Sequence, residues 1–141
     1  MNKVSPQLKF LFLLIKTQTL LTRRFDNGLG GLGLNEFMIL FHLDDSPDKK
    51  LRRIDLANKI GLTASGVTRI LLPMEKIGLI SRDINVKDAR VSYVAIAPGG
   101  KRKYEEGLER AEYLIKDIMP EKFVKNVASL KELLLILNGS L

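Results

Sequence analysis

Two short amphipathic segments that meet at a glycine, Gly61, constrain the fold of this chain more than any other feature. The first segment covers about residues 53–60, and its apolar positions follow helical spacing, so we expect Ile54, Leu56, Ala57 and Ile60 to be buried. Gly61 stands where a helix can end in a left-handed residue, and Thr63 can cap the next helix with its hydroxyl. The second segment has an apolar stripe at Val67, Ile70, Leu71 and Met74. The pattern predicts two tandem helices joined by a tight turn.

Around this pair, the sequence predicts further helices and one β-hairpin. Apolar spacing indicates helices at residues 6–24, 35–43, 98–119 and, beyond Pro120, up to residue 137. Residues 79–83 and 91–96 are rich in β-branched and aromatic residues, which is typical of strands. The glycine-rich stretch 26–33 and the polar stretch 44–50 are expected to be loops. We therefore predict a single domain over residues 1–141, mainly α with a small β-hairpin.

The predicted helix at 35–43 can be capped by Asn35, and we expect Phe37, Leu40 and Phe41 on its buried side. His42, the only histidine, lies near the end of this helix. A packed or half-exposed imidazole is the default there, and a role in ligand binding or pH sensing is the alternative.

The charge of the chain is unevenly distributed. The formal net charge is +7, and residues 49–103 hold thirteen Lys and Arg against four Asp and Glu. The rest of the chain holds ten basic residues against twelve acidic ones. Such segregation marks a surface that binds a polyanion, although a solvated basic face without a partner is the alternative.

Two helices joined through a glycine and followed by a basic hairpin are the order of a helix-turn-helix with a wing. Small residues near the start of the second helix, Ala64, Ser65 and Gly66, allow its backbone to approach the major groove of DNA. Thr68 and Arg69 can reach phosphates or base edges, and the hairpin tip would lie over the neighbouring minor groove. An αα-hairpin packed inside an ordinary domain is the alternative.

These residues resemble the MarR (multiple-antibiotic-resistance regulator) family from Leu34 to about Lys101. The resemblance is carried by Leu56-Ala57-x-x-Ile60-Gly61-Leu62-Thr63-x-x-x-Val67-Thr68-Arg69, Met74-Glu75-Lys76-x-Gly78-Leu79-Ile80, Asp88-Ala89-Arg90 and Ile96-x-Pro98-x-Gly100. It implies that Arg90 enters the minor groove while Asp88 holds the wing loop. It also implies that helices at 4–24 and 98–138 intertwine with a second subunit around a DNA-binding lobe at 34–97. A small-molecule pocket is then expected between the two parts.

The chain departs from the family pattern at three points. Arg52 stands where a capping Ser or Thr is usual, a loss of about 1 kcal/mol, and a phosphate contact is our hypothesis for its compensation. Pro73 is expected to interrupt the second helix and bend its C-terminal half. The absence of cysteine excludes the peroxide-sensing branch of the family as a guide.

Other classes of function find little support in the sequence. With no cysteine and one histidine, neither a nucleophile–base pair nor a zinc site can be assembled, so we expect no catalysis, cofactor or metal. Residues 28–33 fit G-x-G-x-x-G, but they follow a predicted helix and lack the βαβ unit that a dinucleotide needs. The apolar run 10–15 is too short to span a membrane, so a cytoplasmic protein is expected.

The sequence therefore predicts a homodimeric regulator that binds a pseudo-palindromic site in double-stranded DNA and usually represses transcription, and it leaves open both a regulator relieved by a small-molecule effector and one that acts without a ligand. The candidate DNA-binding residues are Thr63, Ala64, Ser65, Thr68, Arg69, Arg82, Lys87, Asp88 and Arg90. A winged-helix dimer that binds a protein instead of DNA is the alternative, and it would lack salt-sensitive affinity for DNA.

Overall fold

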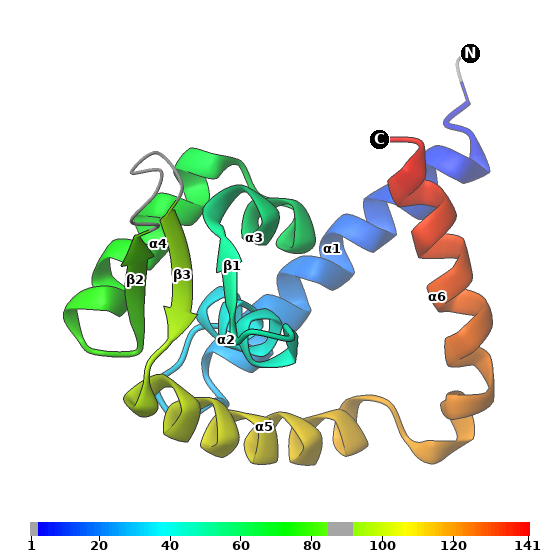
Figure 1. Cartoon of the computed structure of the whole chain (residues 1–141). Coiled ribbons are helices and arrows are strands. Elements are labelled where there is room, and N and C mark those ends of the chain that lie inside the picture. The colour runs from blue at the N-terminus through cyan, green and yellow to red at the C-terminus, as the bar shows by residue number, and fades with distance from the viewer. Residues whose placement is uncertain (1–2, 85–91) are drawn as a thin grey trace.

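The computed structural model describes residues 3–84 and 92–141. Its elements, in chain order, are α1 (Pro6–Asp26), α2 (Leu34–Asp45), β1 (Lys50–Arg52), α3 (Arg53–Ile60), α4 (Ala64–Lys76), β2 (Ile80–Ile84), β3 (Ser92–Ile96), α5 (Pro98–Ile118), the 3₁₀ turn η1 (Glu121–Phe123) and α6 (Val124–Gly139). In Figure 1, α2 to β3 form a lobe that lies over the first half of α5. Helices α1 and α6 extend to the other side, where the two chain ends lie.

The sheet has three strands instead of the predicted two. Strand β1 pairs antiparallel with β3, with Leu51 opposite Val94, and β3 pairs antiparallel with β2, so the order is β1-β3-β2. The prediction of a loop over 44–50 was therefore wrong at Lys50, which is in β1, and at Asp44 and Asp45, which form the end of α2. A strand of three residues is too short to show alternation, and it exists because β3 supplies its hydrogen-bond partners.

The tandem helices confirm the central prediction. Gly61 ends α3 with φ 74° and ψ 27°, the left-handed conformation that a side chain disfavours. Thr63 Oγ1 accepts a hydrogen bond of 3.1 Å from the Gly66 amide and caps α4. Pro73 does not interrupt α4, which continues to Lys76. Pro73 has no N–H group, so the carbonyl of Arg69 loses its hydrogen-bond partner within the helix. Because Arg69 and Pro73 are both exposed, water can bind this carbonyl instead.

The core of the lobe joins α2, α3, α4 and the sheet. Its fully buried members include Ile39, Leu40, Leu43, Leu56, Val67 and Met74. Phe37 packs on this core as predicted, but Phe41 and Ile54 are 40% and 53% exposed. Both stand on the outer side of a helix that is covered on one face only, so the expectation that they are buried was wrong.

Local hydrogen bonds set the start of α2 and the placing of α5. Gly33 is the N-cap of α2, and its amide donates to Glu36 Oε1 at 2.9 Å, so the expectation that Asn35 caps this helix was wrong. At the start of α5, a Cβ on Gly100 would lie 1.9 Å from the carbonyl oxygen of Leu79. The absence of a side chain at Gly100 lets α5 pack directly on the strand entry.

Helices α1 and α6 differ from the lobe. Within the described chain neither contains a buried residue, although both are rich in apolar side chains. The exposed ones include Phe12, Leu13, Ile15, Leu130, Leu133, Leu135 and Ile136. No helix in residues 3–84 and 92–141 combines the length and the apolar character that a membrane span requires.

Candidate nucleic-acid interface

The N-terminal end of α4 presents small and polar groups to solvent. Thr63 and Ser65 are exposed, and their hydroxyl oxygens lie 3.3 Å apart. Ala64, between them, is half-buried and has no long side chain to keep a ligand away. Arg69, one turn further on, is exposed. These residues lie together on one end of one helix, as the sequence predicted.

Thr68 connects α4 to α3. Its hydroxyl donates to the carbonyl oxygen of Ala64 at 2.9 Å and accepts a hydrogen bond of 3.1 Å from Arg53 Nη1. Arg53 was missing from the sequence-based candidates. Its contact with Thr68 spans fifteen positions of the chain, and only the packing of the two helices reveals it.

Arg52 lies next to Arg53 but has a different partner. Its Nε and Nη2 atoms donate to the two carboxylate oxygens of Asp55, at 2.9 and 3.2 Å. This hydrogen-bonded pair lowers the pKa of the Asp55 carboxyl. Arg52 is the N-cap of α3 and makes no capping hydrogen bond, as the sequence indicated. The guanidinium is held by Asp55, and the hypothesis of a phosphate contact stays a prediction.

The strands of the wing are braced by two ion pairs. Arg82 on β2 donates from Nε to Glu75 on α4 at 3.1 Å. Lys50 Nζ lies 2.9 Å from Asp83 and 5.2 Å from the centre of the Tyr93 ring, and the hydrogen bond to Asp83 raises the pKa of Lys50. The first pair fixes the wing against α4, and the second joins the outer strands across the middle one.

Three predicted DNA-binding residues, Lys87, Asp88 and Arg90, lie outside the described residues. Their roles in the wing stay predictions. Arg82 is the one wing candidate that the structure describes, and Glu75 orients its guanidinium in the middle of β2.

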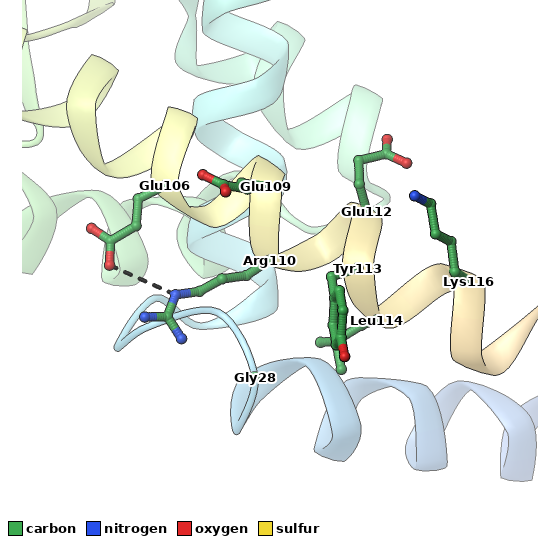
Figure 2. A pocket seen from close by; sticks show the side chains of 8 residues that line it. All are labelled: Gly28, Glu106, Glu109, Arg110, Glu112, Tyr113, Leu114 and Lys116. Atoms are coloured by element: carbon green, nitrogen blue, oxygen red, sulfur yellow. Dashed lines mark ion pairs between the residues drawn. The ribbon is translucent and has the colours of Figure 1, made fainter.

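A separate cavity of about 690 Å³ lies where the end of α1 meets α5. It is lined by Gly28, Glu106, Glu109, Arg110, Glu112, Tyr113, Leu114 and Lys116. Figure 2 shows Tyr113 and Leu114 reaching from α5 towards the turn at Gly28, with Arg110 beside them. Arg110 Nε is 3.7 Å from Glu106, which the dashed line marks. The walls combine apolar surface with charges of both signs, so the cavity suits an amphiphilic molecule.

His42 lies on α2 in the lobe, away from this cavity. Burial lowers the pKa of its imidazole, Lys59 lowers it further, and Asp45 opposes the change. Among residues 3–84 and 92–141, no three His, Asp or Glu side chains gather in a way that could hold a metal ion.

The sequence of this region is similar to that of known transcriptional regulators. Residues 32–92 match the model of the MarR family. An uncharacterized HTH-type transcriptional regulator of Bacillus subtilis (strain 168), YdgJ, is 25% identical over 92 residues, which are 65% of this chain. The match covers 53% of that regulator, so the chain spans about half of its length.

Two solved structures match over the whole chain. The transcriptional regulator BldR from Sulfolobus solfataricus has a TM-score of 0.85 and 26% identity, with both chains covered completely. Sco3205, a MarR family transcriptional regulator from Streptomyces coelicolor solved in complex with DNA, has a TM-score of 0.85 and 20% identity over 100% of this chain and 91% of that one. Residues 32–92 are therefore similar to the MarR family, and the chain has the winged-helix fold of these regulators.

Proposed function

We propose that this protein is a dimeric transcriptional regulator that binds double-stranded DNA sequence-specifically and represses transcription in the cytoplasm. The observation that carries the proposal is the exposed end of α4, where hydroxyls and Arg69 stand together beside Arg53 on the neighbouring helix. The N-terminal end of the second helix in such a pair enters the major groove. The likeness to Sco3205, solved with DNA, supports this reading.

In this proposal, Thr63, Ser65 and Arg69 face the major groove. Ala64 allows the close approach of the helix, and Arg82, held by Glu75, contacts DNA from the middle of β2. Lys87 and Arg90 meet the minor groove or the backbone, with Asp88 holding the loop between them. No catalytic activity is proposed, because a single histidine and the absence of cysteine leave no nucleophile–base pair in the sequence.

The proposed dimer uses the helices at 4–24 and 98–138. The exposed apolar residues of α1 and α6 would be covered by the same helices of a second copy. A twofold axis then presents two α4 helices to half-sites about one helical turn apart.

Selection from a random duplex library by the purified protein at moderate salt tests the proposal. An enriched inverted repeat with half-sites about 10 base pairs apart is expected. A folded dimer that enriches no sequence would contradict it and favour a winged-helix adaptor that binds protein.

A single substitution tests the wing. We expect Arg90→Ala to weaken binding to the selected duplex strongly without changing the melting temperature. Lys125→Ala, which changes an exposed cation on α6, is the matched control and should bind as the wild type does. Equal affinities of the two variants would remove Arg90 from the interface.

We also infer that a small molecule in the cavity between α1 and α5 relieves DNA binding. Tyr113 and Leu114 offer apolar surface, and Arg110 and Lys116 offer cations beside the carboxylates of Glu106, Glu109 and Glu112. The ligand class that we propose is an aromatic or aliphatic acid whose carboxylate replaces Glu106 as the partner of Arg110. Titration of such acids into the protein–duplex complex should release the duplex from the wild type and less readily from Arg110→Ala. Release at equal concentrations from both proteins would place the effector site elsewhere.

A further inference from the structure

Two neighbouring arginines at the start of α3 are held in different ways. Arg52 forms two hydrogen bonds with the Asp55 carboxylate, so its charge is compensated within the helix. Arg53 donates to a neutral group, the Thr68 hydroxyl, at 3.1 Å. Within the described chain, Arg53 forms no ion pair with a carboxylate. The two side chains share a type and a location but differ in net local charge.

The Thr68 hydroxyl is occupied by the protein. Its one hydrogen goes to the Ala64 carbonyl oxygen at 2.9 Å, and one lone pair accepts from Arg53. A hydroxyl has one donor only, so Thr68 cannot donate to a base or a phosphate without giving up the bond within α4. Thr68 is also half-buried, whereas Arg69 beside it is exposed. The geometry of Thr68 suits a side chain that orients a neighbour.

Arg53 is placed to meet the DNA backbone. It is the first residue of α3, and the first helix of a helix-turn-helix crosses the backbone while the second enters the groove. A guanidinium has five N–H donors, and Thr68 takes one of them. The remaining donors form the planar fork that binds phosphate oxygens in pairs.

We propose that Arg53 binds a DNA phosphate and that Thr68 is the positioning residue that holds its guanidinium there. This inference rests on the proposed DNA-binding function and assigns Thr68 a different role from reading a base. Arg53 then contributes affinity without sequence preference, because phosphate contacts carry no base information.

Salt dependence separates the two arginines. Binding of wild type, Arg53→Gln and Arg52→Gln to a mixed-sequence duplex of about three helical turns is measured by fluorescence anisotropy over a range of salt concentrations. We expect Arg53→Gln to lower affinity roughly tenfold and to reduce the slope of log K against log[salt] by about one per subunit. Arg52→Gln should retain the wild-type slope, because Asp55 already compensates the charge of Arg52, and this expectation replaces the phosphate contact hypothesised for Arg52 from the sequence. A wild-type slope in Arg53→Gln, or an equal reduction in both variants, overturns the phosphate assignment.

A double-mutant cycle tests the positioning role of Thr68. Thr68→Val removes the hydroxyl, and we expect it to weaken binding when Arg53 is present and to have little further effect in the Arg53→Gln background. Thr68→Ser keeps the hydroxyl and should restore most of the affinity. Equal losses from Thr68→Val in both backgrounds would show that Thr68 acts on DNA by itself. Melting curves of every variant verify that the fold is retained.

The outcomes distinguish this inference from the function on which it rests. If the wild type binds no duplex at low salt, the DNA-binding function fails and the inference fails with it. If the wild type binds and enriches an operator while Arg53→Gln keeps the full slope, only the inference fails.

Discussion

The winged-helix lobe and the outer helices α1 and α6 use similar apolar residues with opposite results. In the lobe, Leu40 and Leu43 are 0% exposed and lie among residues from α3, α4 and the sheet. On α6, Leu135 and Ile136 are 60% and 63% exposed. Helical structure therefore forms in both regions, but only the lobe has enough neighbouring elements to cover its apolar face.

The difference shows that local signals and burial are separate requirements. Helix α1 has its own start signal, because the Ser5 hydroxyl accepts from the Leu8 amide at 3.2 Å and Pro6 follows the cap. This start signal forms the helix but does not bury its apolar side chains, and α1 has no buried residue. Contiguous exposed apolar surface on two helices is typical of an interface. A second copy of the chain supplies the same two helices and is the proposed cover.

The largest expected effect comes from deleting a buried side chain of the lobe. Leu40→Ala should lower the free energy of unfolding by about 2–5 kcal/mol, because it leaves a cavity in a core that can relax only in part. Leu135→Ala, the same change on α6, should cost less than about 0.5 kcal/mol in dilute protein. Urea denaturation measures both. A loss for Leu135→Ala as large as that for Leu40→Ala would mean that the outer helices are buried as deeply as the lobe.

A second experiment alters the outer helices alone. Leu130→Asp combined with Leu134→Asp places two charges one turn apart on α6 and should convert the dimer into a monomer. Affinity for a paired operator should then fall at least about 100-fold, since the second half-site no longer adds to the first. Light scattering after size exclusion and anisotropy measure the two effects. Ser129→Asp, an exposed polar position of the same helix, is the control and should remain dimeric. Dimers in the double variant would disprove the proposed interface.

Glycines offer a third way to compare the regions. Gly100→Ala should lower the free energy of unfolding by about 1–3 kcal/mol, because its Cβ would collide with the Leu79 backbone. Gly139→Ala on α6 adds a Cβ that has no described atom within 4 Å, so stability should be unchanged or slightly increased. Thermal melting of the two variants checks both signs. Equal melting temperatures would mean that α5 can move away from the strand entry at no cost.

The features that sequence predicted correctly are those fixed within a few residues. Gly61 ends α3 and Thr63 caps α4 through contacts with near neighbours in the chain. The stripe on α4 also buries Val67, Leu71 and Met74 as expected. The order of helices and the two strands of the wing followed from the same kind of local pattern.

The features that could not be predicted from the sequence depend on contacts between distant residues or on competition between neighbouring residues. Strand β1 exists through its pairing with β3, more than forty positions away. Gly33 became the N-cap of α2 because Glu36 reaches back to its amide, which outweighs the better intrinsic cap at Asn35. The contact between Arg53 and Thr68 depends on how α3 packs on α4. The roles of Lys87, Asp88 and Arg90 remain predictions from the sequence.

The smallest expected effect is a dependence of stability on pH that originates in the lobe, because the only histidine lies there. Burial on α2 lowers the pKa of His42 below 6.5, its ordinary value, so the unfolded chain takes up a proton more readily than the folded one. The contribution of His42 to stability is therefore fully present above about pH 6.5 and is lost as the pH falls from there through the lower, folded pKa.

His42→Gln should flatten the curve of unfolding free energy against pH in this window. Asp45→Asn should steepen it, because Asp45 raises the pKa of His42 and its removal enlarges the difference between the two states. Urea titrations between about pH 5 and 8 resolve the slopes. An unchanged slope in His42→Gln would assign the titration to other groups.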